Sequence, residues 1–147
     1  MLARQIPDPA LRRAFRRVGR DAAEVGCFAY AAAEAAYGDD ECEAWRRRLV
    51  AYLRANRDHA ARALESMGVR SVTPEASYLM WLDASEALPP AENAERFFLR
   101  EAAVGLTGGV AFGGAPGTAR LNLGCTRETL DTALERMAAA IDKVRSV

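Results

Sequence analysis

Residues 119–137 read ARLNLGCTRETLDTALERM, and they contain the clearest secondary-structure signals of the chain. The first part of this stretch, Ala119 to Gly124, alternates apolar and polar side chains, as a strand with one buried face does. Thr126 is a good helix N-cap, and the apolar residues after it recur at helical spacing from Leu130 to Val144. The stretch therefore predicts a strand followed directly by a helix with one apolar stripe.

Working outward from this strand, the sequence predicts further helices and strands on its N-terminal side. Helices are expected at 9–19, 21–38, 39–68 and 91–103, and strands at 69–72 and 78–83. The glycine-rich segment 105–117 is expected to be a flexible loop with one short strand. This order predicts the class α/β (α+β), with a small sheet of three or so strands covered by helices.

Composition excludes several classes of function. The 147 residues suit one soluble domain, and 20 basic residues balance 20 acidic ones, so neither nucleic acid nor an anionic membrane is an expected partner. No segment approaches the roughly 20 apolar residues of a membrane span, and the N-terminus lacks the apolar core of a signal peptide. We therefore expect a cytoplasmic protein.

Cysteine and histidine usage gives no metal site. The three cysteines lie far apart and suit free thiols, and His59 is the only histidine. We expect no structural zinc, since one imidazole without a Cys-x-x-Cys pair cannot complete a tetrahedral site. His59 lies in an arginine-rich helix and is expected to be exposed rather than catalytic.

The glycine-rich segment 105–117, GLTGGVAFGGAPG, invites comparison with a phosphate-binding loop. It leads into a strand rather than a helix and lacks Gly-Lys-Ser/Thr, so a nucleotide site is not expected. A mobile edge that closes over a ligand is the interpretation we prefer.

Arg120 is the candidate binding residue. An arginine in the middle of a strand is costly to bury unless its planar guanidinium pairs with a carboxylate, which it can do through two parallel hydrogen bonds. Alternation places Asn122 on the same face, as a second donor toward the same ligand. From the residues alone, Arg120 can also be a surface residue or the partner of an internal Asp or Glu.

The quoted stretch resembles the C-terminal signature of the cystathionine β-lyase branch of fold-type-I pyridoxal-phosphate enzymes, within the class I/II aminotransferases. Other segments agree with the family pattern in the same order: IPDPALRRAF (6–15), AAYGDDECEAWRRRLVAYLRANRD (35–58) and PEASYLMWLD (74–83). The resemblance covers nearly the whole chain.

The resemblance implies that residues 39–147 form the C-terminal small domain of the aminotransferase fold. Residues 1–38 would be connecting helices that lead from a missing N-terminal, cofactor-binding domain. Arg120 matches the arginine that holds the substrate α-carboxylate, and Tyr78 matches a position near the active-site entrance. Together with Asn122, placed beside Arg120 by alternation, these are the predicted substrate-binding residues. The implied entrance loop contains Gly109, Phe112 and Gly113, and it departs from the family pattern at Gly108, where relatives commonly have proline.

The implied activity is that of a carbon-sulfur β-lyase acting on cystathionine or cysteine conjugates, as a homodimer with pyridoxal 5'-phosphate. The family attaches this cofactor to a lysine, and the only lysine here is Lys143, near the chain end. We expect no catalytic residue in this chain and no cofactor bound by it alone, so that it is a fragment of the complete enzyme. Two alternatives stay open: an aminotransferase small domain, and a non-catalytic binding module that kept the fold.

Overall fold

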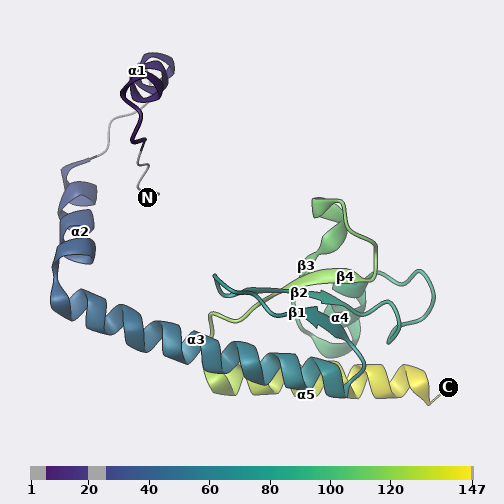
Figure 1. Ribbon diagram of the computed structural model, residues 1–147. Coiled ribbons are helices and arrows are strands. Elements are labelled where there is room, and N and C mark those ends of the chain that lie inside the picture. Colours follow the sequence, from purple (N-terminus) through teal and green to yellow (C-terminus); the bar gives the residue numbers. More distant parts are fainter. Residues whose placement is uncertain (1–5, 20–25, 147) are drawn as a thin grey trace. The chain divides into compact units, whose positions relative to one another are not determined.

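The computed structural model describes residues 6–19 and 26–146 (Figure 1). The chain divides into two compact units, Met1–Arg47 and Arg48–Val147. The long helix α3, Asp40–Ser66, begins in the first unit and continues in the second. The expected domain boundary after residue 38 stays a prediction.

The first unit contains helix α1, Pro9–Val18, and helix α2, Cys27–Gly38. The Asp8 carboxylate accepts hydrogen bonds from two free backbone N–H groups at the start of α1, with Pro9 in the first helical position. Asp39 caps the start of α3 in the same way. The described parts of α1 and α2 contain no buried residue. Residues 21–25 of the predicted second helix lie outside the described residues.

The second unit is built on a four-stranded antiparallel sheet with the order β1-β2-β4-β3. Its strands are β1 Arg70–Val72, β2 Leu79–Asp83, β3 Thr107–Gly108 and β4 Thr118–Asn122. The strands predicted from alternation are confirmed, and the short strand expected in the glycine-rich segment is β3.

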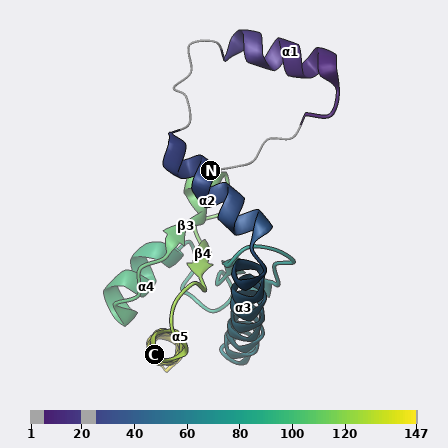
Figure 2. The same cartoon turned by 90° about the vertical axis from the view of Figure 1, so that its left-hand side faces the viewer.

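Three helices cover one face of this sheet: the second half of α3, α4 (Ala94–Ala102) and α5 (Arg127–Arg145). Figures 1 and 2 show the second half of α3 and α5 running alongside each other on the same side of the strands. The core contains the following side chains of the sheet and helices: Leu64, Met80, Leu82, Phe97, Phe98, Ala119, Leu121, Leu130, Met137 and Ile141. Burial of this apolar surface supplies most of the stabilisation of the unit.

Two predicted details differ from the structure. The helix expected from residue 91 begins at Ala94, because Ala91 has a left-handed backbone (φ 62°) and the Asn93 side chain caps the helix. The apolar stripe of α3 is buried at Ala60 and Leu64, whereas Trp45 is 59% exposed. The first half of α3 therefore carries exposed apolar side chains, of which Trp45 is an example.

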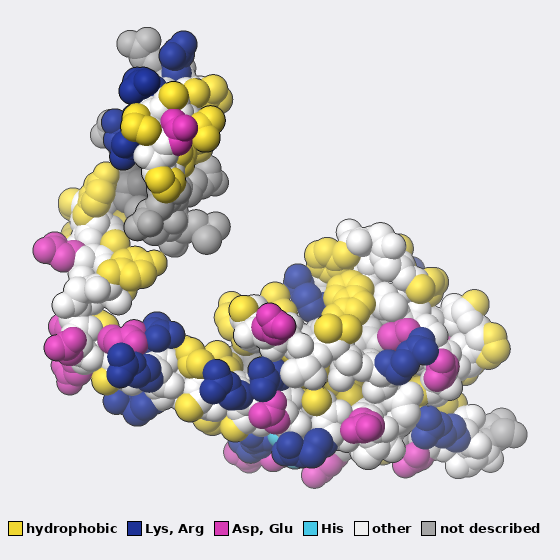
Figure 3. Space-filling model, in the orientation of Figure 1, with side chains coloured by type: hydrophobic (Ala, Val, Ile, Leu, Met, Phe, Trp, Pro, Cys, Tyr) yellow, Lys and Arg dark blue, Asp and Glu magenta, His cyan; other side chains and the backbone are white. Residues whose placement is uncertain are grey.

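The other face of the sheet is the uncovered face, and it consists of Leu79, Trp81, Thr118, Arg120 and Asn122 from β2 and β4, with Phe112 beside it. Strand alternation turns these side chains away from the core. Asn122, at the end of β4, also lines a pocket with Leu49, Tyr52 and Leu53 of α3. Figure 3 shows hydrophobic side chains gathered beside basic ones on this side of the sheet.

Candidate functional site

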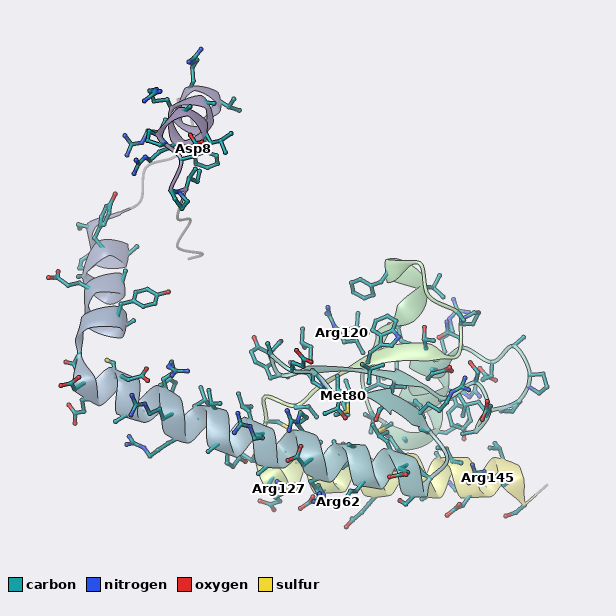
Figure 4. All side chains as sticks on the ribbon, viewed as in Figure 1. Asp8, Arg62, Met80, Arg120, Arg127 and Arg145 are labelled. Atoms are coloured by element: carbon teal, nitrogen blue, oxygen red, sulfur yellow. The ribbon has the colours of Figure 1, made fainter. Side chains whose placement is uncertain are left out.

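Arg120 lies in the centre of the uncovered face. It is the middle residue of β4, paired across the sheet with Trp81 of β2 on one side and Thr107 of β3 on the other. Figure 4 shows its side chain on the opposite side of the sheet from Met80, which points toward α3. The Arg120 side chain is half-buried. A central strand thus holds its backbone rigidly while its head group faces outward.

The guanidinium of Arg120 meets an aromatic ring rather than an acid. Its Cζ atom lies 4.8 Å from the centroid of the Phe112 ring, which is cation–π geometry. The Trp81 ring meets Phe112 edge-to-face, with centroids 5.9 Å apart and an interplanar angle of 81°. Among the described residues, no Asp or Glu forms an ion pair with Arg120. The alternative of an internal acidic partner is therefore excluded within that part of the chain.

Phe112 is the last residue of a short 3-10 helix, η1, Gly109–Phe112. Gly113 closes this turn with a left-handed backbone (φ 79°), a conformation that favours glycine, and its N–H donates to the carbonyl of Val110. A Cβ on Gly109 would lie 2.8 Å from the carbonyl oxygen of Thr118, so only glycine permits this approach to β4. The predicted entrance-loop residues thus have distinct places: Phe112 beside Arg120, and the two glycines in the turn that carries it.

Asn122 shares the face of Arg120, as alternation predicts. Its Oδ1 accepts a hydrogen bond of 2.8 Å from the backbone N–H of Gly124. No hydrogen bond from its Nδ2 is made within the described residues. The amide is thereby oriented by the turn after β4, with its donor group still available to a ligand.

Tyr78 immediately precedes β2 and is 48% exposed. Its ring lies over Gly124, where an added Cβ would be 3.3 Å from Tyr78 Cδ2. A pocket of about 660 Å³ brings Tyr78 and Asn122 together, and it is lined by Leu49, Tyr52, Leu53, Tyr78, Asn122, Gly124, Cys125 and Thr126. Arg120 does not line this pocket but lies two residues from Asn122 on the same strand face. Asn122 is therefore the predicted residue that both lines this pocket and shares the strand face of Arg120.

Asn56 is a residue of this region that the sequence interpretation missed. It is fully buried, and its Nδ2 donates to the carbonyl of Leu123 (3.2 Å) and to that of Cys125 (3.1 Å). The hydroxyl of Tyr52, one turn earlier on α3, lies 3.4 Å from the same Cys125 carbonyl. Asn56 thus fastens the turn after β4 to α3. In the sequence, the signal for this role was a polar residue, Asn56, on the apolar stripe of a predicted helix.

His59 and Lys143 lie away from the uncovered face. His59 is half-buried on α3, and its Nε2 lies 2.6 Å from Oδ1 of Asp131 on α5, so it joins two helices of the core side. Lys143 is exposed near the end of α5. The residues of this chain therefore do not fit a covalently held pyridoxal phosphate, since the only lysine is on a helix that covers the opposite face from Arg120.

The described residues also bear on metal binding and membrane insertion. No group of three or more His, Cys, Asp or Glu residues suited to a metal ion occurs in the described ranges. Of the helices in those same ranges, none is both long and apolar enough to cross a membrane.

Comparison with known proteins identifies the family. Residues 5–137 match the family model described as aminotransferase class I and II, and the chain belongs to this family. It is 41% identical over 118 residues to a cystathionine β-lyase of Corynebacterium glutamicum, covering 80% of this chain and 31% of that protein. It is 38% identical over 121 residues to cystathionine β-lyase PatB of Bacillus subtilis, with 80% and 30% coverage. The chain spans about a third of the length of these curated relatives.

Solved structures agree with this assignment. OvoB matches with a TM-score of 0.81 and 37% identity over 92% of this chain and 35% of its own. A pyridoxal-phosphate-bound putative aminotransferase from Clostridium difficile matches with a TM-score of 0.76 and 33% identity, covering 92% of this chain and 36% of its own. The recognised family and the α/β fold class are confirmed. Pyridoxal-phosphate-dependent enzymes share this fold, and the present chain matches a part of them.

Proposed function

We propose that this chain is the C-terminal, substrate-carboxylate-binding part of a pyridoxal-phosphate-dependent carbon-sulfur β-lyase. Its substrates would be cystathionine or cysteine conjugates, and Arg120 would hold their α-carboxylate. The chain alone would be catalytically incomplete, because the lysine that binds the cofactor would lie in a separate, larger domain. The complete enzyme would be a cytoplasmic homodimer.

The observation that carries this proposal is that the guanidinium of Arg120 has no acidic partner among the described residues. A half-buried guanidinium on a central strand, with no acidic partner in the described residues, has in-plane N–H groups left to donate. A carboxylate satisfies such a planar pair of donors with two parallel, charge-assisted hydrogen bonds. The neutral amide of Asn122 on the same face would add a donor without repelling the ligand.

The part that this chain would play is recognition and orientation. Arg120 would fix the carboxylate, so that the rest of the amino acid points away from the sheet toward the absent domain. Fixing one end of a substrate in this way contributes to rate by removing its rotational freedom before reaction. The uncovered face, with its exposed apolar groups, would be the surface over which the substrate and the absent domain lie.

The lyase assignment is favoured over the aminotransferase assignment by the named relatives. Two proteins called cystathionine β-lyase share 41% and 38% identity with this chain. An aminotransferase remains the second candidate, because a structural relative at 33% identity is described as a putative aminotransferase. Both reactions need the same carboxylate contact, so Arg120 does not separate them.

The test is a hybrid enzyme in which this chain replaces the matching part of the Corynebacterium glutamicum cystathionine β-lyase. The hybrid is assayed for thiol release from cystathionine and, separately, for transfer of the amino group to a keto acid. We expect thiol release without any keto acid. Amino transfer without thiol release would establish the aminotransferase instead.

A folded hybrid that binds pyridoxal phosphate but performs neither reaction would contradict both candidates and favour a non-catalytic module. The isolated 147-residue chain is the matched control. On titration with pyridoxal phosphate it should produce no protein-bound absorbance band, and a stoichiometric band would contradict the assignment of cofactor binding to the absent domain.

A further inference from the structure

We propose that Phe112 is a positioning residue for Arg120, and that with Trp81 it forms an aromatic brace which holds the guanidinium ready for a carboxylate. This inference rests on the proposed function, since it deepens the role of Arg120. The contact that carries it is the 4.8 Å separation of Arg120 Cζ from the Phe112 ring centroid.

The brace occupies one part of the guanidinium and leaves another free. The Phe112 ring lies on one side of the guanidinium, which carries five N–H groups, and a carboxylate needs only two of them. The ring can therefore stay in place while a carboxylate binds in the plane of the guanidinium. An acidic partner would have occupied these N–H groups and competed with the substrate, and no such partner is present among the described residues.

Trp81 and the glycines fix the position of the Phe112 ring. Trp81 is the cross-strand partner of Arg120 and contacts Phe112 edge-to-face, so the three side chains support one another on the uncovered face. A Cβ on Gly114 would lie 3.2 Å from Trp81 Cζ2, which shows how closely the loop backbone approaches the tryptophan. The glycines therefore bring the loop close enough to place its aromatic ring over a residue of β4.

The expected effect of the brace is preorganisation. A long arginine side chain samples many rotamers, and ordering it when a ligand binds weakens binding. Holding the guanidinium against the Phe112 ring before binding removes part of that loss. Removal of the ring should therefore weaken carboxylate binding by about two- to fivefold, the range that a half-exposed cation–π contact supports.

NMR of the intact 147-residue chain tests the brace directly. The Nε–Hε signal of Arg120 is assigned with the Arg120→Ala variant and followed during titration with propionate, a simple monocarboxylate. We compare wild type with Phe112→Leu and with Phe112→Tyr. The matched control is Val110→Ala, which alters another exposed apolar side chain of η1 that makes no ring contact.

In the wild type, the ring current of Phe112 should move the Arg120 Hε signal upfield, and propionate should shift it downfield because a hydrogen bond to a carboxylate deshields the proton. Phe112→Leu should abolish the upfield position and raise the Kd for propionate by about two- to fivefold. Phe112→Tyr should restore both values, since it keeps the ring. Val110→Ala should change neither, and thermal unfolding should verify that all variants stay folded.

The failure of this inference is distinguishable from failure of the proposed function. If Phe112→Leu leaves the Hε position and the Kd unchanged while Arg120→Ala abolishes binding, the brace is wrong and the carboxylate site stands. Arg120→Ala has no Hε signal, so its response to propionate is read from the backbone amide signals of Leu121 and Asn122. If these amides shift alike in the wild type and in Arg120→Ala, the carboxylate site itself is contradicted. The Hε position without ligand still tests the contact between Phe112 and Arg120 in that event.

Discussion

The two faces of the sheet differ in what their side chains do, although the same strands supply both. On the covered face, Met80, Leu82 and Leu121 are buried against helices. On the uncovered face, Trp81 and Arg120 are half-buried and contact a loop instead. A strand of alternating residues can thus present core side chains on one face and candidate binding groups on the other. Substitutions on the covered face should therefore lower the free energy of unfolding more than substitutions on the uncovered face.

The largest expected effect is on the covered face. Leu82→Ala should lower the free energy of unfolding by about 3 kcal/mol, because it leaves a cavity in a core where Leu82 has no exposed surface. Leu79→Ala is the matched control, since Leu79 is in the same strand but on the uncovered face, and it should cost less than about 1 kcal/mol. Chemical denaturation of the 147-residue chain measures both. Equal losses would contradict the distinction between the faces.

The next effect concerns the link between the core and the site. Asn56→Ala should destabilise the chain by about 2 kcal/mol, because it removes two hydrogen bonds and leaves the carbonyls of Leu123 and Cys125 without this buried donor. The same measurement applies. A companion variant, Tyr52→Phe, removes a longer and more exposed hydrogen bond and should cost less than about 1 kcal/mol. If both variants are neutral, the turn after β4 is not fastened by α3.

Cysteine reactivity provides a smaller contrast between partly buried and exposed positions. Burial raises the pKa of the Cys125 thiol, whereas Cys42 is exposed. Because the thiolate is the reactive form, Cys125 should react with iodoacetamide at pH 8 about tenfold more slowly than Cys42. Mass spectrometry of tryptic peptides during a time course follows each site. Equal rates would mean that the turn containing Cys125 opens readily.

The smallest expected effect is on stability at the uncovered face. Arg120→Ala should change the free energy of unfolding by no more than about 0.5 kcal/mol, since the side chain makes no ion pair with a described residue and only one half-exposed ring contact. Denaturation of this variant beside Leu82→Ala provides the comparison. A loss near that of the core variant would assign Arg120 to the scaffold rather than to a ligand.

Much of the fold could be predicted from the sequence, because local signals agree with the tertiary structure. Thr126 and Asp39 cap the helices expected after them, and alternation identified the faces of β2 and β4. The helix start at Ala94 was missed, since a left-handed alanine at position 91 is not a feature that composition reveals.

The site could be predicted only in part. Alternation placed Arg120 and Asn122 on one face, but it could not say what the guanidinium contacts. The contact of Phe112 with Arg120 depends on how a glycine-rich loop folds back over β4. The turns between these two residues have a geometry that no periodicity encodes. The role of Asn56 was hidden for the same reason, since its partners lie 67 and 69 residues away in the sequence.

Binding of the substrate α-carboxylate by Arg120 can be measured in the hybrid enzyme with two substrates that differ only at that group. S-benzyl-L-cysteine carries the carboxylate, and S-benzyl-L-cysteinamide carries a neutral amide. Arg120→Ala should lower kcat/KM about a hundredfold for the acid, which corresponds to the loss of a charge-assisted pair, and less than about threefold for the amide. An equal loss with both substrates would contradict carboxylate binding by Arg120.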